Sequence, residues 1–271
     1  MAEATVKKNL LSSEEEASRV SARRAFYLDD AAAVSADGIL AGLANGEELV
    51  DCLARCRAPE GLSASETAQF ALLLSRHLGL PIARVLPLHS GGMRITYVRQ
   101  GLCDAAYSLL TARLPSPTVR YSDTVSDAVD GVSAGIFDFC ILPYADGEGN
   151  PVRSVRRQRE EGGLRVVSLA SVERADGASL TYALCSRDFL MPSGERLLLE
   201  LRLPSLAPSS LDLFLALVRA SHSEVLSLES EGGRLRASVS VTRAGLVPFA
   251  IAYMTLIPSG EIDTLVRYGK A

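Results

Sequence analysis

The stretch that decides the fold runs from Thr118 to Pro143 and reads TVRYSDTVSDAVDGVSAGIFDFCILP. Its first four residues are β-prone, and Ser122-Asp123 supplies side chains that can cap a following helix. Apolar residues then recur at helical spacing, at Val125, Ala128, Val129 and Val132, until Gly135 ends the pattern. Phe137 to Pro143 is almost wholly apolar, which is typical of a strand covered on both faces. The stretch therefore predicts a strand–helix–strand unit whose second strand lies in the middle of a parallel sheet.

The loop after this strand is where we expect a ligand, because ligands of parallel sheets usually sit at the carboxyl ends of the strands. The loop reads YADGEGN over residues 144–150. Our candidate substrate-binding residues are Tyr144, Asp146 and Arg153. Asp146 could polarise a substrate, although its charge would repel a dicarboxylate. Its alternative role is to decorate a glycine-rich turn.

A dense basic run follows the loop and contains Arg153, Arg156, Arg157 and Arg159. Guanidinium groups can clamp carboxylates through two parallel hydrogen bonds, so this run could bind an acidic substrate. The alternative is a solvated helix face that also carries Glu160 and Glu161.

The composition excludes several classes of function. With 271 residues, of which 48% are hydrophobic, the chain is long enough for two or three domains and too apolar for disorder. A net charge of −4 argues against nucleic acid as a partner. The amino terminus lacks the apolar segment of a signal peptide, and no apolar run is long enough to span a membrane. Five cysteines without a disulfide spacing agree with reduced thiols, so we expect a cytoplasmic protein.

We expect neither a cofactor nor a metal. Gly147 and Gly149 precede no helix at the spacing that a nucleotide-binding loop requires. Cys52 and Cys56 are four residues apart on an expected helix, and no third or fourth ligand is near them in the sequence.

The first of three expected domains, residues 1–85, is predicted to be helical. Asp37 to Cys56 carries an apolar stripe at helical spacing, and a second helix is expected to start at Gly46-Glu47-Glu48. Ser63-x-x-Glu66 has the form of a capping box, and the helix that follows it is predicted to end at Gly79.

The other two expected domains contain strands and helices. Residues 93–190 predict a small α/β sheet in the order β-α-β-α-β, followed by two more strands. Residues 194–271 predict the order β-α-β-β-α-β and end in a strand from Ile262 to Tyr268. This second order is that of the split βαβ, ferredoxin-like class. The predicted fold class is therefore α/β and α+β, with a helical segment in front.

These segments resemble prephenate dehydratase followed by an ACT regulatory domain. Arg94-Ile-Thr-Tyr-Val98 and Gly101 are similar to the opening strand and turn of that enzyme. Gly135-Ile-Phe-Asp138 and Leu142-Pro143 are similar to its next segment, and Leu228-Glu229-Ser230 lies where the ACT domain has Ile-Glu-Ser-Arg-Pro. Residues 47–80 faintly resemble the last helix of the chorismate mutase domain that is fused to many dehydratases. The resemblance implies that residues 93–190 form half of a periplasmic-binding-protein-like domain.

The resemblance also implies roles for individual residues. Thr181 would stand for the threonine of the family's Thr-Arg-Phe motif and position the leaving hydroxyl; its alternative is to fill a strand position. ACT domains commonly pair and place an amino acid at their interface, which implies a homodimer through residues 194–271. The effector-binding positions would then be Ser209, Ser210, Leu211, Glu229 and Ser230, whose alternative is to cap a helix and end a strand.

The chain departs from the family at several positions. After Leu-Pro the family has Ile-Glu-Asn-Ser, whereas this chain has Tyr144-Ala145-Asp146-Gly147. The arginine and phenylalanine expected after Thr181 are absent, and the short segment between the loop and Thr181 leaves no room for the second lobe of the enzyme. We therefore predict a non-catalytic, dehydratase-like protein linked to phenylalanine biosynthesis. It would bind a small carboxylate or an aromatic amino acid, or act as a partner subunit. The alternative is an active lyase that converts prephenate to phenylpyruvate.

Overall fold

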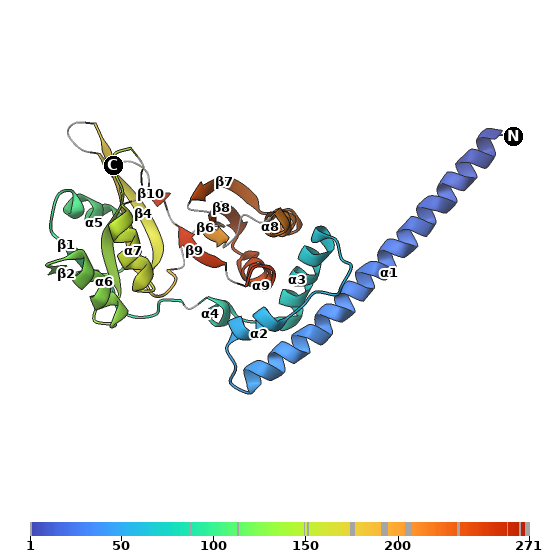
Figure 1. Ribbon diagram of the computed structural model, residues 1–271, viewed down its shortest axis with the longest axis horizontal. Coiled ribbons are helices and arrows are strands. Elements are labelled where there is room, and N and C mark those ends of the chain that lie inside the picture. The colour runs from blue at the N-terminus through green and yellow to red at the C-terminus, as the bar shows by residue number, and fades with distance from the viewer. Residues whose placement is uncertain are drawn as a thin grey trace. The chain divides into compact units, whose positions relative to one another are not determined.

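The computed structural model divides the chain into two compact units, and each is described by itself (Figure 1). The first unit comprises Met1–Pro81, Leu203–Ser223 and Gly245–Gly260, and the second comprises Ile82–Arg202, Glu224–Ala244 and Glu261–Ala271. The division into domains at 1–85, 93–190 and 194–271 stays a prediction. The residues that the structure describes are 2–86, 88–112, 114–148, 150, 152–173, 177–190, 195–203, 208–231, 234–258, 260–265 and 267–268.

The first unit consists mainly of helices. Its helices are α1 (Ala2–Ala44), α2 (Leu49–Arg55), α3 (Ala64–Leu78), α8 (Pro208–Ala220) and α9 (Leu246–Leu256). The predicted capping box is confirmed, since Ser63 Oγ accepts from the Glu66 N–H and Glu66 accepts from the Ser63 N–H at 2.9 Å. The predicted end at Gly79 is confirmed as well, because this glycine adopts the left-handed conformation with φ of 54°.

The apolar stripe from Asp37 to Cys56 does not lie on one helix. Helix α1 continues from the amino-terminal segment to Ala44, and α2 begins only at Leu49. Gly46 lies between them with φ of 87°, a backbone conformation that turns the chain and that glycine adopts without strain. The apolar stripe is therefore shared by two helices, with Ile39 buried on α1 and Leu53 buried on α2.

The second unit contains a six-stranded sheet in the order β10-β4-β5-β3-β1-β2. The strands are β1 (Arg94–Val98), β2 (Thr118–Ser122), β3 (Phe139–Ala145), β4 (Arg165–Glu173), β5 (Ser179–Ser186) and β10 (Arg267–Tyr268). The helices of this unit are α4 (Ile82–Val85), α5 (Cys103–Thr111), α6 (Val125–Ser133) and α7 (Arg153–Glu161). The predicted order β-α-β-α-β followed by two strands is confirmed.

Strand β3 lies inside this sheet, as predicted, but the sheet is not wholly parallel. β3 pairs in parallel with β1, where Ile95 faces Phe139, and antiparallel with β5, where Cys140 faces Cys185. The expectation of a parallel sheet is wrong because β5 follows β4 after a short connection. A connection of that length joins antiparallel neighbours, whereas parallel neighbours need a crossover.

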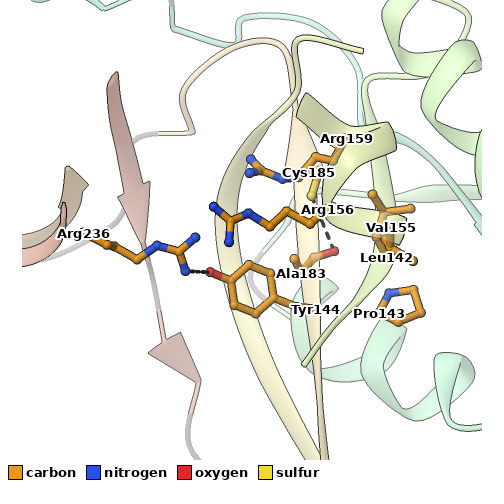
Figure 2. A pocket seen from close by; sticks show the side chains of 9 residues that line it. All are labelled: Leu142, Pro143, Tyr144, Val155, Arg156, Arg159, Ala183, Cys185 and Arg236. Carbon is orange, nitrogen blue, oxygen red and sulfur yellow. Dashed lines mark hydrogen bonds between the residues drawn. The ribbon is translucent and has the colours of Figure 1, made fainter. Parts of the chain in front are cut away.

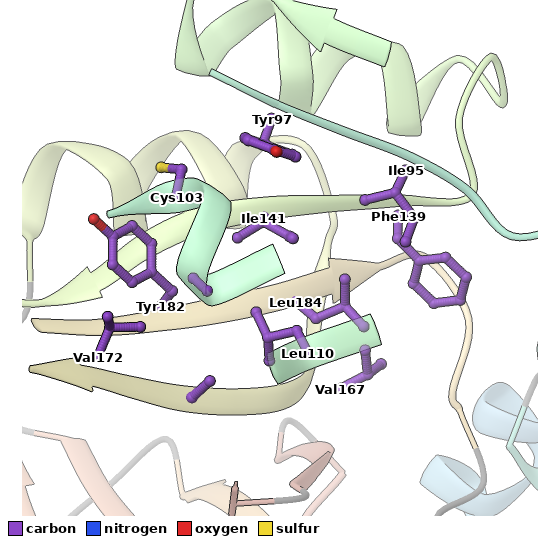
Figure 3. Packing of buried hydrophobic residues seen from close by; sticks show 12 residues of the cluster. Ile95, Tyr97, Cys103, Leu110, Phe139, Ile141, Val167, Val172, Tyr182 and Leu184 are labelled. Atoms are coloured by element: carbon purple, nitrogen blue, oxygen red, sulfur yellow. The ribbon is translucent and has the colours of Figure 1, made fainter. Parts of the chain in front are cut away.

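Both faces of β3 are covered, which explains its apolar sequence. Phe139 and Ile141 belong to a core with α5 that includes Leu110 and Leu184 (Figure 3). Because successive side chains of a strand alternate, Cys140 belongs to a second core, which includes residues of α6 and α7.

Helix α6 is capped by a residue other than the expected pair. Thr124 is the N-cap: its Oγ1 accepts from the Asp127 N–H at 3.1 Å, and Asp127 accepts from the Thr124 N–H at 3.0 Å. The assignment of the cap to Ser122-Asp123 is wrong because β2 extends to Ser122. The Ser122 hydroxyl instead lies 2.6 Å from the hydroxyl of Thr96 on β1.

A four-stranded sheet has the order β7-β8-β6-β9. Its strands are β6 (Arg196–Leu203), β7 (Glu224–Glu231), β8 (Arg234–Thr242) and β9 (Glu261–Leu265). With α8 after β6 and α9 after β8 in the chain, this order is the ferredoxin-like topology predicted from the sequence. Strands β7 and β8 pair antiparallel, with Glu231 in register with Arg234, and residues 232–233 lie outside the described residues. The single final strand is wrong: β9 pairs with β6, and β10 pairs with β4 in the other sheet.

Candidate functional site

A small cavity lies at the carboxyl end of β3, within the second unit (Figure 2). Its residues come from four elements: Leu142, Pro143 and Tyr144 from β3, Val155, Arg156 and Arg159 from α7, Ala183 and Cys185 from β5, and Arg236 from β8. The cavity volume is about 10 Å³. That is room for roughly one water molecule, so the site as it stands is closed to a molecule the size of an amino acid.

A β-bulge presents Tyr144 to this cavity. Pro143 pairs with Tyr182 and Ala145 pairs with Thr181, so Tyr144 is the extra residue on β3. A bulge re-aims the side chain of the inserted residue, which is why bulges are frequent beside functional sites. The phenol oxygen of Tyr144 accepts a hydrogen bond from Arg236 Nη1 at 2.9 Å (Figure 2).

Three arginines line the cavity, and ion pairs connect this region to a fourth arginine and two glutamates; we call these six side chains the arginine cluster. Its members are Arg156, Arg159, Arg202, Arg236, Glu160 and Glu200. Arg236 Nε lies 3.3 Å from Glu200 Oε1, and the two side chains are 12% and 4% exposed. Buried ions of this kind are costly to desolvate, so each requires a nearby opposite charge or hydrogen bond.

Glu160 holds the other three arginines of the cluster. Its Oε1 lies 3.0 Å from Arg156 Nε and 3.3 Å from both Arg159 Nη2 and Arg202 Nη1. Arg159 Nη1 also donates to the carbonyl of Leu164 at 2.9 Å. Burial raises the pKa of Glu160, but the hydrogen bond from Arg156 and the nearby positive charges outweigh it and lower that pKa. Glu160 is therefore a carboxylate at neutral pH.

The ionisation of Tyr144 is set by the same neighbours. Burial is the largest effect and raises its pKa, and the Glu200 carboxylate raises it further. The guanidinium groups of Arg236, Arg159 and Arg202 act in the opposite direction. The net effect keeps the phenol protonated at neutral pH, so Tyr144 can donate a hydrogen bond as well as accept one.

The structure separates the three candidate substrate-binding residues. Tyr144 lines the cavity, whereas Asp146 and Arg153 are exposed and do not line it. Asp146 Oδ1 accepts from the N–H groups of Glu148 at 3.0 Å and Asn150 at 2.8 Å, which holds the loop closed. Arg153 is the first residue of α7.

Thr181 lies on β5, opposite Ala145 on one side and Ser171 on the other. Its hydroxyl is 3.2 Å from the hydroxyl of Ser171, and its side chain is half-buried. Ala183, two residues further along the same strand, lines the cavity, whereas Thr181 does not. Its role in positioning a leaving group stays a prediction.

The five candidate effector residues belong to different units. Ser209, Ser210 and Leu211 form the first turn of α8 in the first unit. Glu229 and Ser230 are exposed on β7 in the second unit, where Glu229 is in register with Arg236. Their role in binding an effector stays a prediction.

Glu200, Arg202 and Arg236 were not predicted from the sequence. A usable signal was present in β6, which reads RLLLELRL over residues 196–203. Glu200 and Arg202 are two residues apart in this Leu-rich strand, so their side chains share one face. Charged residues in a strand that is otherwise apolar indicate a buried ionic network, because an isolated buried charge is too costly.

All five cysteines are free thiols. Cys140 and Cys185 are fully buried, and burial is the main reason that the pKa of Cys140 is raised well above its usual value. Within the described ranges, no group of three His, Cys, Asp or Glu side chains could hold a metal ion. Nor is any described helix both long and apolar enough to cross a membrane.

Fold and site together define a mixed α/β protein with a ferredoxin-like sheet and a buried arginine cluster. No protein-family model matches the chain, and no curated protein matches it. Among solved structures, it is similar to prephenate dehydratase from Streptococcus mutans, at 13% identity and a TM-score of 0.47, over 65% of this chain and 100% of that one. It is also similar to prephenate dehydratase from Arthrobacter aurescens in complex with L-Phe, at 12% identity and a TM-score of 0.47, over 64% of this chain and 90% of that one. A third similar structure is that of the quorum-quenching acylase GqqA, at 17% identity and a TM-score of 0.44, over 66% of this chain and 96% of that one. These similarities assign no role to any residue of this chain.

Proposed function

We propose that the protein is a non-catalytic, prephenate dehydratase-like protein that binds a small carboxylate or aromatic amino acid at the arginine cluster. The observation that carries this proposal is the gathering of four guanidinium groups around Tyr144 at the carboxyl end of β3. That is the edge of an α/β sheet at which ligands usually bind.

The donors of the cluster suit a carboxylate. Arginine offers a planar fork of N–H groups that matches both oxygens of a carboxylate, and Tyr144 adds a neutral O–H donor. The remaining cavity wall is apolar, with Leu142, Pro143 and Val155, and would contact the carbon skeleton of the ligand. A carboxylate beside an apolar group describes an amino acid or a related acid.

Binding requires the cluster to open, since its cavity holds about one water molecule. Arg156 and Glu160 are the members best placed to move, because their side chains are 23% and 34% exposed. If Glu160 turns toward solvent, a ligand carboxylate can take its place on Arg156. The exchange replaces one ion pair by another and keeps the buried charges compensated.

The proposal that the protein is non-catalytic rests on what the candidate catalytic groups bond to. Loss of hydroxide from prephenate needs an acid or donor near the leaving oxygen and a site that excludes water. The Thr181 hydroxyl bonds the Ser171 hydroxyl, and Asp146 bonds the backbone of its own loop. The quoted sequence motifs support further parts of the proposal. They link the protein to phenylalanine biosynthesis and make the four-stranded sheet an ACT-like domain that forms a homodimer. They also give the amino-terminal helices a chorismate mutase-like origin.

Thermal shift measurements with phenylalanine, tyrosine and prephenate test the binding. At ~100 times its dissociation constant, a ligand that binds only the folded protein adds about 2.7 kcal/mol to the free energy of unfolding. We expect a shift with at least one of the three. Arg156→Ala should abolish it, and Arg157→Ala, on the solvent side of the same helix with 80% of its side chain exposed, should leave it unchanged.

Two outcomes would change the proposal. No shift with any of the three acids would remove ligand binding and leave a partner subunit. Turnover of prephenate to phenylpyruvate, abolished by Thr181→Ala, would replace the non-catalytic protein by an active dehydratase.

A further inference from the structure

Helix α1 has an amino-terminal part that other described residues do not cover. Every side chain from residue 16 to residue 27 is exposed, and burial begins at Leu28. Val20 and Tyr27 are 58% and 54% exposed, and Val34 further along is 68% exposed. Isolated helices gain most of their stability from packing, so a helix of this length with exposed apolar side chains calls for a partner.

A heptad pattern of mostly apolar residues runs along the sequence of α1. In the sequence, steps of four and three residues lead along one line of the helix: Val6, Leu10, Ser13, Ala17, Val20, Arg24, Tyr27, Ala31 and Val34. This spacing is that of a coiled-coil seam. Figure 1 draws α1 as one uninterrupted helix, so the line is continuous.

This seam differs from the face that α1 buries within its own chain. The buried residues are Leu28, Ala32, Ala36 and Ile39, on the part of α1 that packs against α2 and α3. Val20, Tyr27 and Val34 lie roughly 130° around the helix from them, at about 100° per residue. Arg24 on the seam pairs with Glu66 of α3, whereas Val20, Tyr27 and Val34 stay exposed while the intramolecular face is packed.

We propose that this seam of α1 binds the same seam of a second copy of the chain, with the two helices antiparallel. In the antiparallel register that places Val20 opposite Ala17, Tyr27 lies opposite Leu10. The same register brings Glu16 next to Arg23 of the second copy. Two-fold symmetry repeats this ion pair, so the flanks of the seam are complementary in charge to themselves.

The parallel arrangement lacks this complementarity. It would bring Glu16 near Ser21, and Arg23 near Leu28, which is already buried in its own chain. The antiparallel overlap from residue 6 to residue 31 extends over about 39 Å of helix. An overlap of that length fits an interface between copies better than a brief contact.

Sedimentation equilibrium of the full chain tests the proposal. We expect the unmodified protein to associate through α1 at micromolar concentration, and Val20→Asp to weaken this association at least tenfold, leaving at most the pairing proposed for the four-stranded sheet. Phe26→Asp is the matched control, because Phe26 is 74% exposed but lies off the seam, and it should leave the dimer unchanged. Circular dichroism checks that each variant keeps its helices.

Charge exchange tests the antiparallel register. Glu16→Arg and Arg23→Glu should each weaken the dimer, and the two together should restore it, whereas Arg19→Glu on another face should have no effect. A monomeric wild-type protein would overturn the proposal and point to a helix of a different protein as the occupant. A dimer that tolerates Val20→Asp would overturn it as well and move the interface elsewhere, for example to the four-stranded sheet.

Discussion

Strand β3 carries an ionic site at each end, and the two sites differ in how their charges are matched. At its start, Asp138 binds one arginine: it accepts from Arg94 N at 2.8 Å, from Nε at 3.0 Å and from Nη2 at 2.9 Å. At its end, the six side chains of the arginine cluster include four guanidinium groups and two carboxylates.

The difference teaches which charges hold the fold and which suit a ligand. Arg94 and Asp138 form a fork-to-fork pair that ties the start of β1 to the start of β3 and saturates the carboxylate. In the cluster, the Glu160 carboxylate is shared among three arginines, so this position already suits a carboxylate group. The first site lies at the amino ends of parallel strands and the second at the carboxyl end, where ligands bind.

The largest expected effect comes from the buried part of the cluster. Arg236→Ala removes the guanidinium beside Glu200, whose side chain is 4% exposed, and should lower the free energy of unfolding by about 3–5 kcal/mol. Urea titration followed by circular dichroism measures it. Arg157→Ala is the control and should cost less than about 0.5 kcal/mol, because its ion pair with Glu161 is exposed. Equal effects of the two variants would contradict the distinction between buried and exposed arginines.

The next effect concerns the opposite end of β3. Asp138→Asn keeps the shape of the side chain but loses the charge-assisted hydrogen bonds to Arg94, and should cost about 1.5–3 kcal/mol. It should not change the thermal shift caused by a ligand. A lost ligand response at full stability would show that both ends of β3 belong to one site. Glu161→Gln, at an exposed carboxylate, serves as control.

The same variant should alter the dependence of stability on pH. Hydrogen bonds from Arg94 hold the pKa of Asp138 below its usual value, and they outweigh the effect of burial. A lowered folded-state pKa means that the stabilisation is complete above the unfolded-state pKa of about 3.9 and is lost as the pH falls below it. Unfolding measured between neutral pH and strong acid should therefore show a shallower acid loss in Asp138→Asn than in the wild type; parallel curves would count against the pairing.

A smaller effect is expected at Tyr144. Tyr144→Phe removes the oxygen that accepts from Arg236 and should cost about 1 kcal/mol of stability. If the phenol contacts a ligand carboxylate, the dissociation constant should rise about tenfold, which corresponds to about 1.4 kcal/mol. Isothermal titration calorimetry on both proteins measures this change. An unchanged dissociation constant would remove Tyr144 from the proposed site.

The smallest effect is expected at Asp146. Asparagine retains an oxygen that can accept from the N–H groups of Glu148 and Asn150, so Asp146→Asn should cost less than about 0.5 kcal/mol. Ligand binding should also be unchanged, because Asp146 does not line the cavity. A large loss of ligand response in this variant would return the loop to the proposed site.

Local features of the fold were predictable because the groups that decide them are close in the sequence. The box of Ser63 and Glu66 involves residues three apart, and its helix was predicted at both ends. The apolar run that became β3 was predicted to be covered on both faces, and its two cores confirm this. The cap of α6 was misplaced by one to two residues, because the length of β2 depends on its pairing with β1 and not on its own composition.

Half of the candidate site was visible in the sequence and half was not. Tyr144 and the basic run that contains Arg156 and Arg159 follow β3 directly and were singled out. Arg236 is 92 residues from Tyr144, and nothing local to either residue indicates that they meet. Asp146 and Arg153 stand in the same stretch as Tyr144, yet Asp146 lies in the loop after β3 and Arg153 at the exposed start of α7.

The sequence by itself determined the order of helices and strands, the caps of α3 and the burial of β3, because spacing and capping act over a few residues. The tertiary structure alone decided that β5 pairs antiparallel with β3, that the last strand divides between two sheets, and that β6 and β8 bring Glu200, Arg202 and Arg236 to the end of β3. The physical reason is the distance along the chain over which each interaction acts. Strand pairing joins residues far apart in the chain, and a charge is stabilised only by the partners that this pairing supplies.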